Sequence, residues 1–156
     1  MARFRRFRRS YGAKTKRNAE RILRAGTSAV PLGSQVVAYT YTATQACVAK
    51  SIKMDLGAIG GFSDNSALAY CLVVVREGYN ANAITYPALT DDMYNPTQDV
   101  LISGVLTDNS SEDHKFNMIG RKLKRGDRIC LIVREWGAGT GTTPTCAFEM
   151  NFSVLT

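Results

Sequence analysis

The final stretch of the chain, residues 146–155, alternates regularly between apolar and polar side chains. The two sets are Phe148, Met150, Phe152 and Val154 on one parity, and Glu149, Asn151 and Ser153 on the other. A period of two places successive side chains on opposite faces of a β-strand, so this pattern predicts a strand with one buried face. Such a strand needs a sheet of partners, and that requirement constrains the fold of everything before it.

The rest of the body consists of short apolar segments separated by turn residues. Strands are predicted over residues 35–44, 48–56, 68–75, 98–107, 115–119 and 128–136. The loops between them, residues 57–66, 78–97 and 137–144, are rich in glycine, asparagine, threonine and proline. Because residues 68–75 are almost continuously apolar, that strand is expected to be buried on both faces. The count is roughly seven strands, or about eight if residues 83–86 pair.

No long helical period appears in this body, and parallel sheets need helical crossovers. The sheets are therefore expected to be antiparallel. With 156 residues the chain has the length of one ordinary domain. We predict an all-β fold, a single jelly roll made of two packed antiparallel sheets.

The positive charge is concentrated at the N-terminus. The net charge is +7, yet residues 1–25 hold ten basic residues and one acid, a net of +9, while the remaining 131 residues sum to −2. The ten basic residues are Arg3, Arg5, Arg6, Arg8, Arg9, Lys14, Lys16, Arg17, Arg21 and Arg24. We predict an arm over residues 1–26 and a jelly-roll domain over residues 27–156. A cationic segment joined to a slightly acidic body indicates a polyanionic partner for the arm alone.

The arm is expected to be largely disordered without that partner, because its charges repel and it has little apolar mass. Residues 14–25 are predicted to form a short helix, with Ala19, Ile22 and Leu23 on one side and Gly26 at its end. Guanidinium groups bind phosphate in bidentate fashion, so all ten basic residues are candidate nucleic-acid ligands. Stacking of bases on Phe4, Phe7 and Tyr11 would favour single strands.

A second basic cluster follows near residue 125. Its members are Arg121, Lys122, Lys124, Arg125 and Arg128. Two interpretations stay open: an inner surface that faces nucleic acid, or a solvated rim balanced by acids such as Asp127.

Residues typical of catalysis or metal binding are scarce. The four cysteines, Cys47, Cys71, Cys130 and Cys146, lack Cys-x-x-Cys spacing and sit in apolar runs, so buried thiols are expected. There is one histidine, His114. We predict no catalytic residues, no cofactor and no metal site, although Asp91 and Asp92 leave open a cation between subunits or a solvated turn. No apolar run is long enough to span a membrane.

Several segments together resemble capsid proteins of small circular single-stranded DNA viruses that encode a rolling-circle replication protein. They are the arginine-rich start from Arg3 to Arg9, and residues 69–78, 94–104 and 123–132. The resemblance implies a jelly roll of two four-stranded sheets. It also implies that roughly 60 copies build a T=1 icosahedral shell with the arms pointing inward.

The resemblance further implies the partners and the location of the protein. The partners are other copies of the chain and single-stranded nucleic acid, with genomic DNA as the expected cargo. The arm is also compatible with host nuclear import receptors. The location is the virion and, during assembly, the host nucleus. Tyr79, Tyr86, Tyr94 and Trp136 are candidate contacts between subunits or core residues. A capsid protein of a small or satellite RNA virus and a cellular basic nucleic-acid-binding protein remain alternatives, because arginine reads phosphate and not sugar.

Overall fold

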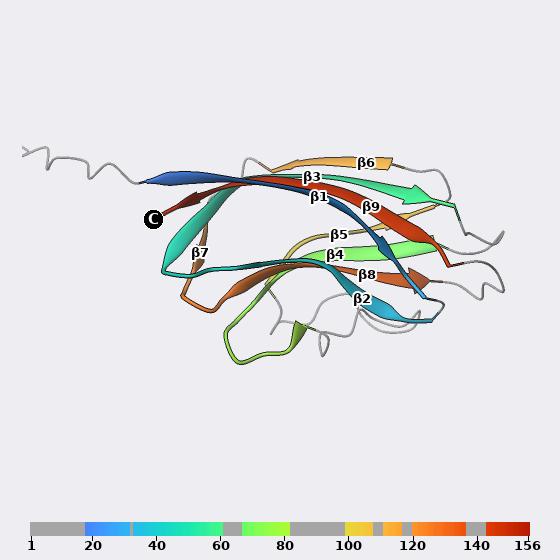
Figure 1. The fold of residues 1–156 in the computed structure, drawn as a ribbon, viewed down its shortest axis with the longest axis horizontal. Coiled ribbons are helices and arrows are strands. Elements are labelled where there is room, and N and C mark those ends of the chain that lie inside the picture. Colours follow the sequence, from blue (N-terminus) through green and yellow to red (C-terminus); the bar gives the residue numbers. More distant parts are fainter. Residues whose placement is uncertain are drawn as a thin grey trace, which may run out of the picture.

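Two antiparallel sheets face each other in the computed structural model (Figure 1). It describes residues 18–31, 33–60, 67–81, 99–107, 111–116, 120–136 and 143–156, with residues 111–116 and 136 described by their backbone. The strands are β1 (Ala19–Ala29), β2 (Gln35–Thr42), β3 (Cys47–Ile59), β4 (Ala67–Val75), β5 (Asp99–Leu106), β6 (Ser111–Phe116), β7 (Arg121–Leu123), β8 (Arg128–Trp136) and β9 (Thr145–Leu155).

The order of the strands is that of a jelly roll, as the sequence predicts. One sheet has the order β1-β9-β3-β6, with β7 also paired to β3, and the other has the order β2-β8-β4-β5. The chain therefore passes repeatedly from one sheet to the other. Near its C-terminal end, β9 lies between β1 and β3, and β8 lies between β2 and β4. The first sheet has five strands because β6 and β7 pair with successive parts of β3.

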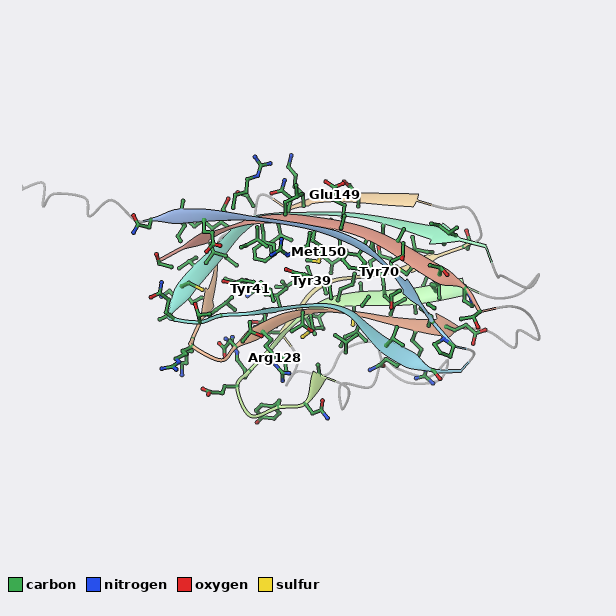
Figure 2. All side chains as sticks on the ribbon, in the orientation of Figure 1. Tyr39, Tyr41, Tyr70, Arg128, Glu149 and Met150 are labelled. Atoms are coloured by element: carbon green, nitrogen blue, oxygen red, sulfur yellow. The ribbon has the colours of Figure 1, made fainter. Side chains whose placement is uncertain are left out.

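The core lies between the sheets, where the buried parity of β9 meets the inner face of β2. The Tyr39 and Phe148 rings lie 5.9 Å apart, and the Tyr41 ring meets Phe152 edge-on at 5.2 Å. Figure 2 shows the two tyrosines and Met150 in the space between the sheets, whereas Glu149 points away from it. The predicted alternation of β9 is confirmed, and these aromatic contacts fix how the sheets stack.

Strand β4 is buried on both faces, as its continuous apolar sequence predicts. Its even-numbered residues enter the core between the sheets. Its odd-numbered residues form a second cluster on the other face, together with Cys130 and Ile132 of β8 and with Ala81. The four-stranded sheet therefore does not present β4 to solvent.

The prediction of a helix over residues 14–25 is wrong for the described part of that segment. Ala19–Ala29 forms β1 and pairs with β9 at eleven consecutive positions. A short isolated helix is marginal, and pairing with β9 gives this backbone a continuous partner instead. Gly26 does not end a helix; it makes room for the Phe148 ring, whose Cζ would lie 3.0 Å from an added Cβ. The sheet thus includes residues 19–26, which the sequence assigns to the arm.

The other predicted strands are present, with boundaries that differ by at most three residues, except the strand predicted over residues 115–119. In its place β6 begins at Ser111, and residues 117–119 lie outside the described residues. The three-residue strand β7 was not predicted. The proposed pairing of residues 83–86 lies outside the described residues. Within the described ranges, no helix is long and apolar enough to cross a membrane.

Candidate nucleic-acid interface

The root of the arm is fixed at one end of the five-stranded sheet. The Thr156 amide donates to the carbonyl oxygen of Asn18 at 3.0 Å, so the start of β1 lies beside the end of β9 (Figure 1). Eight basic and three aromatic residues assigned to the arm interface from sequence lie outside the described residues, so their roles stay predictions. They are Arg3, Arg5, Arg6, Arg8, Arg9, Lys14, Lys16 and Arg17, with Phe4, Phe7 and Tyr11.

The two remaining arm cations, Arg21 and Arg24, lie on opposite faces of β1. Arg21 pairs in register with Ser153, and its Nε donates to Oδ1 of Asn151 at 3.0 Å on the outer face of the sheet. Arg24 pairs in register with Met150, whose side chain enters the core. Burial raises the pKa of Tyr39, and the nearby charge of Arg24 offsets part of that effect. The strand therefore separates two residues that a disordered arm would present together.

The second basic cluster does not form one surface. Lys122 pairs in register with Val48 and shares the outer face of the five-stranded sheet, because its neighbour Leu123 is buried in the core. The Arg121 side chain points to the opposite side of β7 from Lys122, and it forms an ion pair with Asp99 at 3.4 Å.

The other three members of the cluster diverge further. Lys124 and Arg125 are exposed in the turn between β7 and β8. Arg128 points to the far side of the four-stranded sheet and donates to the carbonyl oxygen of Tyr79 (Figure 2). These residues are close together in the sequence, but in the structure their side chains point in different directions because they lie on both sides of a turn.

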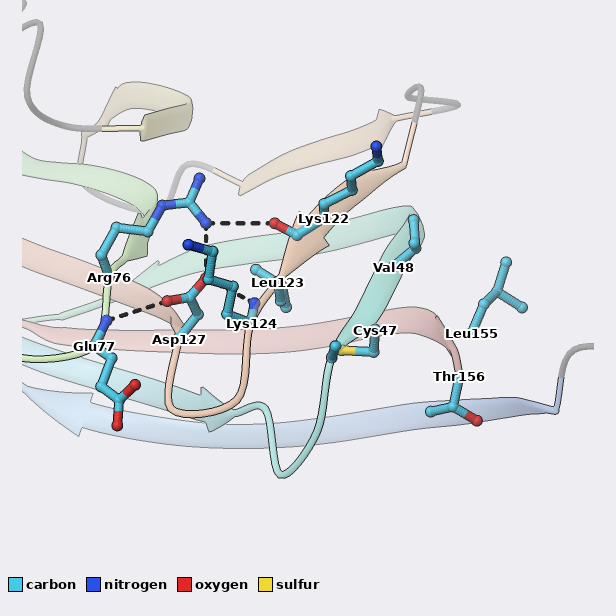
Figure 3. Close-up of a pocket in the computed structure, with 11 residues that line it drawn as sticks. Cys47, Val48, Arg76, Glu77, Lys122, Leu123, Lys124, Asp127, Leu155 and Thr156 are labelled. Atoms are coloured by element: carbon cyan, nitrogen blue, oxygen red, sulfur yellow. Dashed lines mark hydrogen bonds and ion pairs between the residues drawn. The ribbon is translucent and has the colours of Figure 1, made fainter.

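Asp127 is the centre of a buried polar network and not a rim residue. Its side chain is 2% exposed and accepts three hydrogen bonds: from the Arg76 guanidinium at 2.7 Å, from the Lys124 amide at 2.9 Å and from the Glu77 amide at 3.1 Å (Figure 3). Arg76 also reaches Asp99 at 3.2 Å. These contacts tie the end of β4 to the β7–β8 turn.

This network keeps Asp127 ionised. Burial alone raises the pKa of a carboxyl group, but the hydrogen bonds from Lys124, Arg76 and Glu77 and the charge of Arg76 favour the carboxylate. The pKa of Asp127 is consequently below its usual 3.8. The expectation that Asp127 balances an exposed basic rim is therefore corrected. Its charge interacts with Arg76 and with the backbone amides of Glu77 and Lys124 inside the buried network.

A cavity of about 1010 Å³ opens beside this network (Figure 3). Its apolar lining comes from Cys47, Val48, Leu123 and Leu155, and its charged lining from Arg76, Glu77, Lys122, Lys124 and Asp127. Burial raises the pKa of the Cys47 thiol; a hydrogen bond from Tyr41 lowers it in part. The thiol thus stays protonated at neutral pH, which leaves the cavity with binding groups but without a nucleophile–base pair.

All four cysteines are buried free thiols, as predicted. Burial raises the pKa of Cys71 to about 12 and that of Cys146 to about 11. In the described part of the chain, no three histidine, cysteine or acidic residues are grouped as metal ligands.

The remaining candidates are only partly placed. Asp91, Asp92, Tyr86 and Tyr94 lie outside the described residues, and for Trp136 the backbone alone is described, at the end of β8. Tyr79 is 69% exposed.

Two cations on β3, Lys50 and Lys53, were not assigned a role from sequence. Both are exposed on the outer face of the five-stranded sheet. The sequence of β3 contains a sign that both lysines share one face. Its buried apolar residues have odd numbers at Cys47 and Ala49 and even numbers from Ile52 onward. Such a change of phase within one strand indicates a β-bulge.

No protein-family model and no curated protein matches the chain. Among solved structures, a chain of the T13 IBDV viral particle is similar with a TM-score of 0.51 and 10% identity, over 90% of this chain and 31% of that one. A chain of the Gx strain of infectious bursal disease virus gives a TM-score of 0.48 and 12% identity, over 90% and 33%.

A Bacillus endospore appendage protein, from a family of disulfide-linked pili, gives a TM-score of 0.46 and 13% identity, over 94% of this chain and 96% of that one. This chain thus spans about a third of the viral chains it matches. At these identities the similarity concerns the fold alone, and it is the likeness to the T13 viral particle chain that supports the jelly roll.

Proposed function

We propose that this protein is a viral capsid protein that assembles into a small icosahedral shell and packages single-stranded DNA through its N-terminal arm. One observation carries the proposal: a jelly roll, similar in fold to a chain of a viral particle, is joined to a segment with a net charge of +9. The proposed role is structural, and the protein is not an enzyme.

The charge distribution supports a division of labour between the two parts. If roughly 60 copies form a T=1 shell, the arms supply about 540 net positive charges to the interior. Arginine keeps its charge at any relevant pH and binds phosphate without reading sequence. The body sums to −2, so subunits can pack without strong mutual repulsion.

The described surface also offers apolar side chains for contacts between copies. Leu23, Ile59 and Tyr79 are 54%, 56% and 69% exposed. Aromatic residues are enriched in protein interfaces, and the buried centre of an interface is depleted in charged residues. We propose that such residues contribute to contacts between subunits in the shell and that the arm also serves nuclear import.

The test compares cargo in particles made by the full chain and by a variant with five substitutions, R3Q, R5Q, R6Q, R8Q and R9Q. The wild type is expected to yield particles whose nucleic acid resists nuclease and is degraded by DNase after disruption. The variant should form shells with much less cargo, measured by the ratio of absorbance at 260 and 280 nm. Equal cargo in both would contradict the role of the arm, and cargo degraded by RNase alone would favour an RNA-virus capsid.

A further inference from the structure

The outer face of the five-stranded sheet carries a compact group of cations, which we call the basic face. Its members are Arg21 of β1, Lys50 and Lys53 of β3 and Lys122 of β7. The strand order β1-β9-β3 with β7 beside β3 places them across neighbouring strands at about 4.8 Å spacing, so the group spans about 14 Å.

A β-bulge creates this arrangement. Residues three apart in a regular strand point to opposite faces, yet Lys50 pairs with Ser153 and Lys53 with Asn151, both on the outer parity of β9. The register shifts between Lys50 and Lys53, where Ser51 adopts a left-handed conformation with φ of 53°. The extra residue changes the phase of the strand, and it brings both lysines to the same face.

The cations of the basic face are available for a partner. In the described part of the chain, no carboxylate forms an ion pair with Lys50, Lys53 or Lys122. Arg21 donates through Nε to Asn151, and its terminal nitrogens form no ion pair with a described carboxylate. Between the cations, Asn151 and Ser153 of β9 supply neutral polar groups, which can donate hydrogen bonds to phosphate oxygens.

Two carboxylates lie further along the same sheet face. Asp55 and Glu149 pair in register on the outer side of β3 and β9, one step further from the root of the arm. Figure 2 shows Glu149 pointing away from the other sheet. A polyanion on this face is therefore attracted to the end that carries the basic face and repelled from the other end.

From this geometry we infer that the basic face is a second binding site for the phosphate backbone of the packaged single-stranded DNA, and that the five-stranded sheet faces the interior of the shell. The site is continuous with the arm, because Arg21 is itself one of the predicted arm cations and lies beside the point where β1 begins. The inference rests on the proposed function and adds to it two residues, Lys50 and Lys53, and an orientation of the sheet.

The test uses the full chain and the variant Lys50→Gln/Lys53→Gln, with binding to an oligothymidylate of about 40 nucleotides measured over a range of salt concentrations. Each phosphate contact to a single strand contributes about 0.7 to the slope of log K against log salt, so the slope should become shallower by about 1.4. Lys50→Arg/Lys53→Arg keeps both charges and should retain the wild-type slope. Arg134→Gln removes a charge from the four-stranded sheet and should also leave the slope unchanged.

The outcomes separate this inference from the proposed function. If the wild type neither binds the oligonucleotide nor assembles, the proposed function fails. If the wild type binds and Lys50→Gln/Lys53→Gln has the same slope, the inference alone is wrong. An equal loss of slope in Arg134→Gln would assign the effect to net charge, and defective assembly with an unchanged slope would assign the basic face to contacts between copies; either result overturns the inference.

Discussion

Replacing Asp127 by asparagine should destabilise the jelly roll at neutral pH. The substitution keeps the size of the side chain and changes one oxygen into an amide donor. Oδ1 accepts from the Glu77 amide and Oδ2 from both Arg76 and the Lys124 amide. An asparagine can serve either oxygen position with its single acceptor, so at least one donor must lose its partner.

The structure gives the size of the effect. A hydrogen bond that involves a charged group contributes about 1.5–3 kcal/mol, and a buried donor left without a partner costs about 1–3 kcal/mol. The Arg76 side chain is 47% exposed and can be rehydrated, which reduces its share of the loss. We therefore expect the free energy of unfolding to fall by about 2–4 kcal/mol.

Urea denaturation of unassembled protein, followed by circular dichroism, measures this change. The matched control is Asp99→Asn, because Asp99 contacts the same Arg76 at 3.2 Å but is 26% exposed. The control should lose less than about 1 kcal/mol. Equal losses in both variants would refute the idea that burial of Asp127 makes its contacts strong.

The pH dependence provides a second check on Asp127. Its pKa in the folded protein lies below the usual 3.8. The carboxylate therefore stabilises the fold above pH 3.8, and this contribution is lost as pH falls through the lower, folded-state pKa. The difference between wild type and Asp127→Asn should be largest near neutral pH and should shrink in acid. A difference that is constant with pH would contradict the assignment.

Two further predictions concern packing and thiol chemistry. Gly104→Ala should lower the free energy of unfolding, measured by urea denaturation, by about 1–3 kcal/mol, because the new Cβ would lie 2.3 Å from the Tyr70 hydroxyl oxygen. The control Gly57→Ala, whose Cβ would have no atom within 4 Å, should change the free energy of unfolding little. Similar losses in the two variants would contradict this packing. Iodoacetamide at pH 8 should leave Cys71 and Cys146 unmodified in the folded protein and label both in urea, as read by mass spectrometry; rapid labelling without denaturant would show that these thiols are accessible.

Much of the fold could be predicted because period and composition are local signals. The alternation of apolar and polar residues in β9 predicts a strand with one buried face, and the continuous apolar run in β4 predicts a strand buried on both faces. Charge segregation likewise separates the arm from most of the body without any structure.

The sequence was misleading where pairing partners decide the conformation. The spacing of Ala19, Ile22 and Leu23 fits a helix, but the eleven pairs with β9 are contacts distant in sequence that local propensity does not include. Strand β7 has three residues, too few to show a period. For Lys50, a single extra residue at the bulge reverses the face to which it points.

The candidate site shows the same limit. The neighbours of Asp127 along the chain include several basic residues, which suggests a solvated rim. Its actual partner is Arg76, 51 positions away at the end of β4. Ion pairs of this kind depend on the sheet topology, and composition gives no information about them.

Sedimentation velocity of the purified full chain, with and without oligothymidylate, tests the central claim most directly. The account predicts one large, uniform species whose formation is weakened by added salt, since the arms bind phosphate through charge. A chain that sediments as a monomer at every concentration, in the presence and in the absence of the oligonucleotide, would contradict it.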